Sequence, residues 1–313
     1  MSKASQYKKS PADFSISDWK QIVLRTYKNI GGEKLSLISA GVAFYFLLAV
    51  FPLLASLVSL YGLIVSPETA AMQLQSLLQS MPQSGQEELL DRITDIASQN
   101  QGTLGVGMVV GFLLSIWSGS KGAKALITAS NVTYKEDKSR GFISATIARI
   151  ALTLSVVIII CLFMSIMTLL PLALDATIGS SGRQSLVGFI RWPVLILFFI
   201  GSLALLYRYA PHREPPNFRW VMPGALLAAM LWIAASIGFS LYLEKFASYN
   251  ETYGSIGGVI ALLMWFYITA YTVLLGAELN ACCELQTRTD STTGPSEPMG
   301  ERGATVADQW RGE

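Results

Sequence analysis

The chain has 313 residues, of which 52% are hydrophobic and only 14% are charged, and its mean hydropathy is +0.46. Soluble domains usually carry about 25% charged residues, and here the uncharged residues form long runs, so the composition indicates a polytopic membrane protein rather than a soluble domain. The net charge of +2 says little by itself, and three cysteines exclude a disulfide framework.

The first 34 residues are polar and basic, and the first apolar run is too long for a secretion signal. We expect residues 1–34 to form a cytoplasmic segment that contains an amphipathic helix, because Ile16, Trp19, Val23 and Ile30 fall roughly on one helical face. Such a helix lies in the headgroup region of a membrane, although a soluble docking helix has the same pattern.

The first predicted span covers residues 35–65 and is longer than one perpendicular crossing requires. It should therefore tilt, or bend at Pro52, where the proline ring removes one backbone hydrogen bond. Pro52 is a candidate hinge, although membrane helices also tolerate proline without a functional reason.

The remaining apolar runs predict an all-α fold with six membrane spans in residues 35–285. The first two spans are separated by an acidic segment, residues 66–102, which is expected to form a helical extracytoplasmic loop. Spans two to six are predicted at residues 103–120, 150–174, 192–210, 221–243 and 255–279.

The last span has two different faces. Small and hydroxyl residues share one face with Trp265, and lipid tails give no reason for such clustering, whereas a neighbouring helix does. Trp265, Thr269 and Thr272 are therefore packing residues, or they line a cavity and are candidate substrate-binding residues. Glu278 is the carboxylate embedded in a span, and it is a second candidate unless it pairs with Arg149 or Arg208.

Two further positions can shape the entry to a span. Tyr253 and Gly254 precede span six, where a tyrosine is typical of the membrane interface and a glycine permits a close turn. Pro223 and Gly224 lie at the start of span five, where a proline also needs no functional explanation. All four are candidate gating or hinge residues.

The distribution of Lys and Arg predicts the orientation. With both termini on one side, that side holds nineteen of the 23 basic residues and the opposite side holds four. This positive-inside bias predicts that both termini are cytoplasmic. The tail, residues 286–313, is rich in Thr, Ser, Gly and Pro and is expected to be disordered.

Basic residues flank the predicted spans on the cytoplasmic side. Arg140 and Arg149 stand where the chain re-enters the membrane for span three, and Arg208 ends span four. Such cations fix the topology, and they can also bind an anionic lipid headgroup. We therefore treat all three as candidate substrate-binding residues.

Three blocks of sequence resemble a known family. They are SAGVAFYFLLAVFPLL (39–54), WSGSKGAKALITASNVTY (117–134) and the continuous run of residues 207–281. They resemble the YihY/BrkB family of bacterial inner-membrane proteins, also labelled ribonuclease BN-like. The resemblance implies a six-helix protein of the cytoplasmic membrane, but the labels of the family conflict: nuclease, virulence factor and carrier of envelope lipids.

The residues argue against the nuclease label. Metal-assisted RNA hydrolysis needs a cluster of His and carboxylate ligands, but the chain has one histidine, His212, with no metal-binding motif beside it. Phosphate-binding loops are also absent. We expect no enzyme activity, no catalytic residue, no metal, no cofactor and no nucleic-acid partner.

The leading functional hypothesis is a transporter or flippase-like carrier that moves a lipid or amphiphilic anion in envelope biogenesis. Its groove is expected between spans one, two, five and six, with basic residues at the cytoplasmic mouth. The alternatives are a non-transporting membrane scaffold for envelope assembly or virulence and, third, a ribonuclease. Expected partners are membrane lipids, including an anionic lipid as substrate, and a homo-oligomer is left open.

Overall fold

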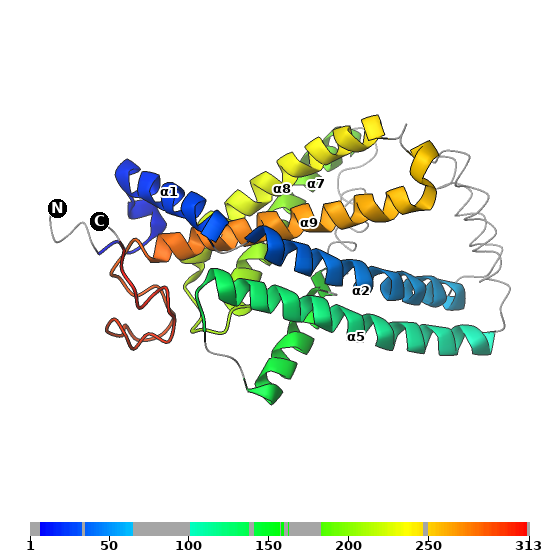
Figure 1. Cartoon of the computed structure of the whole chain (residues 1–313), viewed down its shortest axis with the longest axis horizontal. Coiled ribbons are helices and arrows are strands. Elements are labelled where there is room, and N and C mark those ends of the chain that lie inside the picture. The colour runs from blue at the N-terminus through cyan, green and yellow to red at the C-terminus, as the bar shows by residue number, and fades with distance from the viewer. Residues whose placement is uncertain are drawn as a thin grey trace. The chain divides into compact units, whose positions relative to one another are not determined.

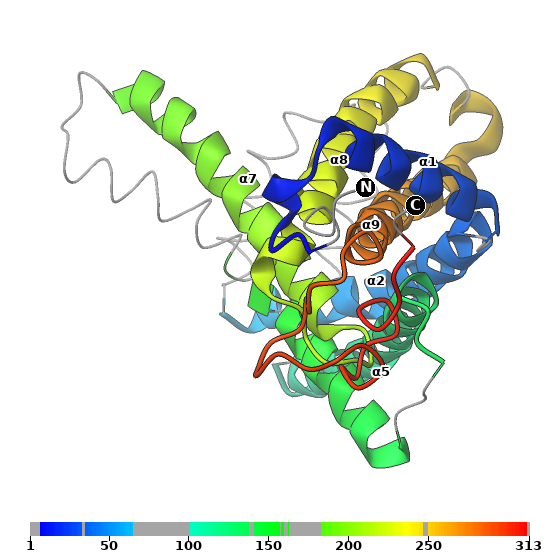
Figure 2. The same ribbon diagram turned by 90° about the vertical axis from the view of Figure 1, so that its left-hand side faces the viewer.

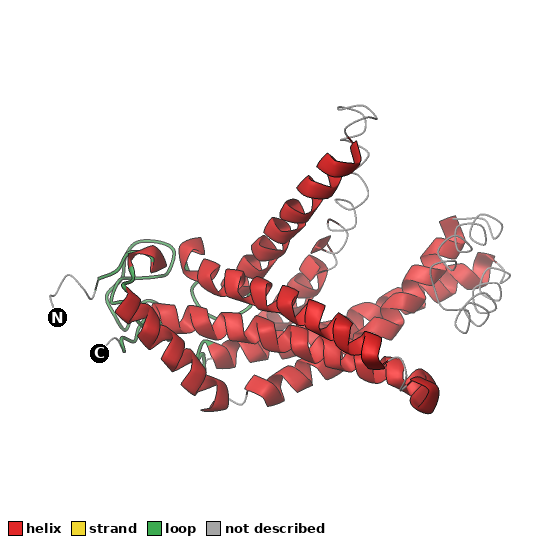
Figure 3. Ribbon diagram, turned by 90° about the horizontal axis from the view of Figure 1, so that it is seen from above, coloured by secondary structure: helices red, strands yellow, loops and turns green. Residues whose placement is uncertain are grey.

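The computed structural model describes residues 7–32, 35–64, 101–137, 141–156, 158–159, 162, 183–246 and 250–311. Helices make up most of this part of the chain, and loops make up the rest, including the tail after residue 284 (Figure 3). Its only β pairing is one isolated bridge between Pro216 and Thr292. The predicted all-α fold is thereby confirmed. The helices are η2 (Pro11–Asp13), α1 (Ile16–Gly32), α2 (Leu35–Ile64), α5 (Gln101–Thr133), α7 (Arg183–Tyr209), α8 (Phe218–Phe246), α9 (Asn250–Glu284) and a shorter apolar helix, Phe142–Val156.

In the described ranges, three helical segments are long and apolar enough to cross a membrane: Trp192–Tyr209, Phe218–Glu244 and Gly257–Glu284. Ile16–Gly31 and Leu35–Val50 pass the same test together as one span bent by 66°, which would make four. The predicted loop 66–102 and most of the predicted span 150–174 lie outside the described residues, so the count of six spans stays a prediction.

The chain forms two compact units, residues 1–44 with 123–313 and residues 45–122. In the smaller unit, a methyl group at Gly122 would come within 3.0 Å of the Phe46 ring, so these two residues lie against each other. The helix α5 continues to Thr133, beyond the predicted end of span two at residue 120. The continuation is helical because Leu126, Ile127, Ala129 and Ser130 repeat at helical spacing and are buried.

The larger unit is built on the pair α8 and α9, which lie side by side along most of their lengths (Figure 1). The two backbones are closest where Gly224 of α8 faces Gly276 of α9. A methyl group at Gly276 would lie 2.5 Å from the Gly224 carbonyl oxygen, 2.5 Å from the Tyr207 hydroxyl and 2.8 Å from the Ala228 methyl. Glycine is therefore required at this crossing.

A buried asparagine completes the same contact. The backbone N–H of Gly224 donates to Oδ1 of Asn280 at 2.7 Å, and Nδ2 of Asn280 donates to the Val221 carbonyl at 3.1 Å. Pro223 lies inside α8 and has no N–H of its own, so this turn of the helix lacks one backbone hydrogen bond. The Asn280 side chain supplies partners for the backbone groups there, which fixes the register of α8 against α9.

The helix α1 packs on the end of α9. Ile22 of α1 is fully buried and joins Trp220, Leu279, Cys282 and Cys283 in one apolar cluster. The opposite face of α1 exposes Ile16, Val23, Leu24 and Tyr27. The helix is therefore amphipathic, but the face that packs on the protein is that of Ile22, whereas the predicted apolar face leaves Ile16 and Val23 uncovered.

The tail differs from the expectation of disorder. It folds back over the end of α9 (Figure 2), and its Val306 is fully buried in the main apolar cluster with Ala277, Ala281 and Leu285. The N-terminal segment meets it there, because the Lys8 backbone N–H donates to the Thr287 hydroxyl and that hydroxyl donates to the Lys8 carbonyl.

The tail is ordered by polar contacts, which its composition does not reveal. The guanidinium of Arg302 is buried and donates to the carbonyl oxygens of Glu297, Ala307 and Arg288. Burial raises the pKa of the nearby Asp290 carboxyl, but hydrogen bonds from the backbone N–H groups of Glu297 and Thr292 and from the Thr292 hydroxyl outweigh it. The pKa of Asp290 therefore lies below its usual value.

Gly276→Ala should destabilise the protein, because the added methyl group has no space between α8, α9 and Tyr207. Overpacking of this kind costs about 1–3 kcal/mol or more. Gly238→Ala on α8 is the matched control, since a methyl group there meets nothing within 4 Å. Thermal unfolding in detergent measures both, and a Gly276→Ala variant that unfolds at the wild-type temperature would contradict the close crossing.

The order of the tail should depend on pH through Asp290. A depressed carboxyl pKa contributes stability above the unfolded pKa of about 3.9, and this contribution is lost as pH falls through the folded pKa. Asp290→Asn should therefore loosen the tail at neutral pH, and wild type and variant should converge once the pH falls below the lowered pKa of Asp290. Amide hydrogen exchange of residues 285–311, corrected for the intrinsic effect of pH, measures this.

Glu301→Gln is the control for that experiment, because it removes an exposed carboxylate from the same tail. It should leave the exchange of the tail unchanged. Equal protection of the tail in wild type and Asp290→Asn at neutral pH would show that the carboxylate does not order it.

Candidate functional site

Two of the predicted site residues on α9 pack against α8. The indole Nε1 of Trp232 donates to the Thr269 hydroxyl at 3.1 Å, and the Trp265 ring lies 5.5 Å from the Trp232 ring and 5.4 Å from the Phe239 ring. Thr272 donates to the carbonyl of Thr269 at 2.9 Å. The contacts of Trp265 and Thr269 hold α8 and α9 together, as expected if this face serves packing, whereas the Thr272 hydrogen bond lies within α9.

Glu278 is fully buried where α1 crosses α9. Its Oε1 accepts a hydrogen bond from Asn29 Nδ2 at 2.6 Å and one from the Cys282 thiol at 3.3 Å. The sequence suggested Arg149 or Arg208 as its partner, but the structure brings Asn29 of α1 to this oxygen instead. Glu278 therefore helps to hold α1 against α9.

Of the candidate hinges, Pro223 and Gly224 belong to the close crossing of α8 and α9. Pro52 lies in α2, and Tyr253 and Gly254 lie in the first turns of α9, but their side chains are outside the described residues. Arg140 is also outside them.

The two remaining predicted cations are on helices that face each other. Arg208 is in the last turn of α7, and its guanidinium lies 4.3 Å from the Phe218 ring and 5.3 Å from the Tyr209 ring. Arg149, on the helix Phe142–Val156, donates to the Ala145 carbonyl at 3.1 Å and to the Thr146 hydroxyl at 2.8 Å. None of these four contacts of Arg208 and Arg149 is with a carboxylate.

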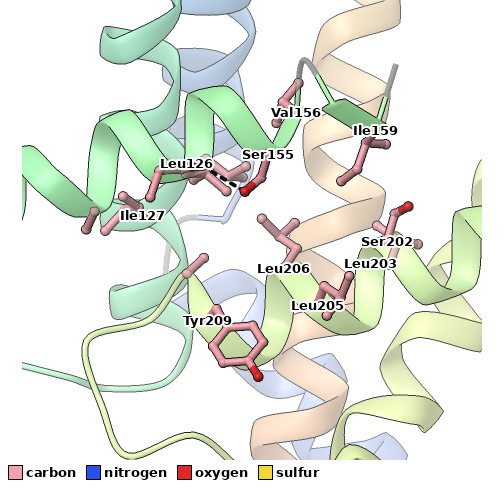
Figure 4. Close-up of a pocket in the computed structure, with 14 residues that line it drawn as sticks. Leu126, Ile127, Ser155, Val156, Ile159, Ser202, Leu203, Leu205, Leu206 and Tyr209 are labelled. Atoms are coloured by element: carbon pink, nitrogen blue, oxygen red, sulfur yellow. Dashed lines mark hydrogen bonds between the residues drawn. The ribbon is translucent and has the colours of Figure 1, made fainter. Parts of the chain in front are cut away.

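A cavity of about 500 Å³ lies between the end of α5, the helix Phe142–Val156 and α7 (Figure 4). Its walls are mainly hydrocarbon. The lining residues are Leu126, Ile127, Ala148, Ala151, Leu152, Ser155, Val156, Ile159, Ser202, Leu203, Leu205, Leu206, Tyr209 and Ala210.

The polar groups of the cavity are few. The Ser155 hydroxyl donates to the Ala151 carbonyl at 2.8 Å and the Ser202 hydroxyl donates to the Phe198 carbonyl at 2.9 Å, so both are bonded within their own helices. The Tyr209 hydroxyl is the other side-chain polar group in the lining. An apolar cavity of this kind suits a hydrocarbon chain and offers nothing to coordinate an ion.

The predicted cations stand beside this cavity. Arg149 is the neighbour in sequence of the lining residue Ala148, and Arg208 is the neighbour of Tyr209. Both cations are therefore on helices that line the cavity, and the Arg208 guanidinium lies 5.3 Å from the ring of the lining residue Tyr209. An amphiphilic anion needs an apolar volume and a cation of this kind.

The sequence did not locate this cavity. The groove was predicted between spans one, two, five and six, whereas the cavity described here is lined by α5, by α7 and by the helix that begins the predicted span three. Ala148, Leu152, Ser155 and Ile159 recur at steps of four and three, which places them on one helical face. That pattern identifies a face but not the helix opposite, so it could not have placed the cavity.

A buried ion pair was also missed. Arg213 donates to Glu284 through both terminal nitrogens, at 3.1 and 2.6 Å, and both side chains are fully buried. The Ser291 hydroxyl donates to the same carboxylate at 2.6 Å, and the Tyr134 ring lies 4.3 Å from the guanidinium. Burial lowers the pKa of Arg213, but the carboxylate of Glu284 more than offsets it, so the pKa is raised.

This ion pair connects four segments: Tyr134 after α5, the loop between α7 and α8, the end of α9 and the tail. Burial also raises the pKa of Tyr134, whose phenol therefore stays neutral. A buried pair of this type is costly to break, because removing one partner leaves an uncompensated charge. We assign it to the structure of the bundle end.

His212 lies in the same loop as Arg213. Its backbone N–H donates to the Asn131 side chain at 2.7 Å, which ties the loop to α5. In the ranges that the structure describes, no group of three or more His, Cys, Asp or Glu residues is arranged to hold a metal ion.

Comparison with known proteins identifies the family. The family model described as virulence factor BrkB matches residues 26–300, which is most of the chain. The chain belongs to the BrkB family. The resemblance read from the three sequence blocks is thereby confirmed. No solved structure matches the chain.

Curated relatives cover most of the chain as well. The ribonuclease-like protein YfkH of Bacillus subtilis is 34% identical over 253 residues, which cover 78% of this chain and 88% of the relative. A UPF0761 membrane protein of Pseudoalteromonas translucida is 27% identical over 296 residues, which cover 90% and 91% of the two chains. This similarity and the apolar helices together show that the BrkB-family chain is a membrane protein.

Proposed function

We propose that this BrkB-family protein is a carrier of the flippase type, which moves a lipid or amphiphilic anion across the bacterial cytoplasmic membrane during envelope biogenesis. The observation that carries the proposal is the apolar cavity between α5, Phe142–Val156 and α7, with Arg149 and Arg208 on two of the helices that line it. An acyl chain fits its hydrocarbon walls, and a guanidinium favours a phosphate or carboxylate headgroup.

The proposal includes a topology of six spans with both termini in the cytoplasm. The excess of Lys and Arg on one side of the predicted spans supports it. The hydrogen bonds between Lys8 and Thr287 also support it, since they join the N-terminal segment to the tail. In this topology Arg149 and Arg208 lie at the cytoplasmic end of the cavity, where a newly made anionic lipid would enter.

We further propose that the protein is not an enzyme and does not act on nucleic acid. The ribonuclease-like name belongs to the Bacillus subtilis relative. In this chain the hydrophobic cavity offers no acid–base pair for hydrolysis. His212 holds its loop through a backbone contact with Asn131 on α5, which favours a structural role for that loop.

Reconstitution of the purified full-length protein in liposomes tests the proposal. A fluorescent anionic phospholipid placed in one leaflet should reach the other leaflet faster in vesicles that contain the protein than in protein-free vesicles. If no movement occurs with or without a proton or sodium gradient, the carrier function is wrong and a scaffold role is favoured.

Leu152→Trp should slow this movement about tenfold, because the larger side chain fills the cavity. A tenfold loss corresponds to about 1.4 kcal/mol in the barrier to lipid movement. The matched control is Leu154→Trp on the same helix, which is 45% exposed and does not line the cavity. Equal rates of lipid movement in the two variants would show that the lipid does not pass through this cavity.

Arg149→Gln should reduce movement of an anionic lipid several-fold and leave movement of a zwitterionic lipid less affected, because one headgroup contact of about 1 kcal/mol is removed. Lys28→Gln, which removes an exposed cation from α1, is the control. Both variants should reach the membrane in wild-type amounts. Unchanged selectivity in Arg149→Gln would exclude this guanidinium from headgroup binding.

A further inference from the structure

A second groove, of about 770 Å³, lies between η2, α1 and the first half of α8. It shares no lining residue with the cavity described above. Its walls are Ser10, Pro11, Ala12, Trp19, Val23, Arg219, Met222, Pro223, Leu226, Leu227, Met230 and Leu279. All but two of these, Ser10 and Arg219, have apolar side chains.

One wall is a stripe along α8. Met222, Leu226 and Met230 recur every four residues and are 40%, 47% and 61% exposed. They lie in the segment Phe218–Glu244, which is long and apolar enough to cross a membrane. The stripe therefore runs from the start of a membrane helix toward the hydrocarbon core, the path of an acyl chain.

The opposite wall comes from the N-terminal segment. Trp19 and Val23 of α1 contribute apolar surface, and Pro11 and Ala12 of η2 close the end. The ring of Trp19 is held by Phe14, with 5.8 Å between the ring centres in an edge arrangement. This wall distinguishes the groove from an open helix face, because a molecule that enters it is contacted from two elements.

Among the described residues that line the groove, Arg219 is the charged one. Arg219 is in the first turn of α8, and its Nη1 donates to the carbonyl oxygen of Lys9 at 3.3 Å. Among the described residues, no carboxylate pairs with it. The nearby carboxylate of Asp13 instead accepts the backbone N–H groups of Lys9 and Ser10, at 3.1 and 2.9 Å.

We propose that this groove binds one anionic phospholipid, with an acyl chain along Met222, Leu226 and Met230 and the phosphate at Arg219. The volume is in the range of about 300–1,000 Å³ that is usual for ligand sites. The cation lies at the end of a membrane helix, where headgroups lie, and its remaining N–H groups can donate to phosphate oxygens. A second copy of the chain would instead bury Arg219 against another protein surface.

This inference does not depend on the proposed transport. The bound lipid is a resident of the groove, held where α1 meets α8, and its chemistry is that of an anionic headgroup with hydrocarbon chains. Failure of lipid movement in the liposome assay would leave the groove unaffected, because the two sites have no residue in common.

Quenching of Trp19 fluorescence tests the proposal, since bromine on an acyl chain quenches an indole that it touches. The full-length protein is placed in phosphatidylcholine vesicles that contain a minor fraction of chain-brominated phosphatidylglycerol. A parallel sample contains the same fraction of chain-brominated phosphatidylcholine. The fluorescence of Trp19 is obtained as the difference in emission between each protein and the same protein that also carries Trp19→Phe.

The Trp19 signal should be quenched about fivefold more by the anionic lipid, as one cation near a membrane surface provides about that preference. Arg219→Gln should remove the preference. Lys20→Gln, which removes an exposed cation of α1 that does not line the groove, should retain it.

Equal quenching by the two lipids in the wild type would overturn the proposal, because it would show that Trp19 touches bulk membrane lipids without selecting an anionic one. No quenching by either lipid would also overturn it, and would indicate that a second copy of the chain or another protein covers the groove. A preference that survives Arg219→Gln would exclude the cation on which the proposal rests.

Discussion

The close crossing of α8 and α9 is the constraint on which the larger unit depends. Inside a membrane, the hydrophobic effect gives two apolar helices no reason to associate, so dispersion contacts and hydrogen bonds between them must supply the attraction. Gly224 and Gly276 let the backbones approach, and Asn280 bonds to the backbone of α8 beside Pro223. Together they fix both the distance and the register of the pair, and the Tyr207 hydroxyl joins α7 to it through the Val273 carbonyl.

That register determines what meets at the end of the bundle. It places Glu284, in the last turn of α9, against Arg213 in the loop that follows α7. The buried pair is then completed by Tyr134 and Ser291, so charged and polar contacts hold the loop and the tail in addition to the apolar contacts of Val306. The cavity beside α7 and the groove beside α8 each have a wall from a helix with exposed apolar side chains.

The sequence predicts the features that depend on local pattern. Long uncharged runs give the helices, and the described part of α2, Leu35–Ile64, is helical throughout, within the predicted span of residues 35–65. The family is readable from three blocks because they carry many residues in fixed order. What could not be predicted depends on pairs of distant residues. Glu278 meets Asn29, Thr269 meets Trp232, and Arg213 meets Glu284, and no periodicity along one helix states which residue lies opposite. The order of the tail could not be predicted for the same reason. Its composition is mostly polar, and the contacts of Arg302 and Val306 that order it are visible only in three dimensions.

The position of Val306 in the core has a consequence for the biogenesis of the protein. Chains fold from the N-terminus as they are synthesised, so α7, α8 and α9 leave the ribosome before the tail does. The apolar cluster around Ala277 and Leu285 lacks one of its side chains, and Glu284 lacks its bond from Ser291, until these last segments emerge. Insertion of the helices into the bilayer therefore precedes the closing of this end, and closure is a late step that follows translation of the segment up to Arg311, whose N–H bonds to the Leu285 carbonyl.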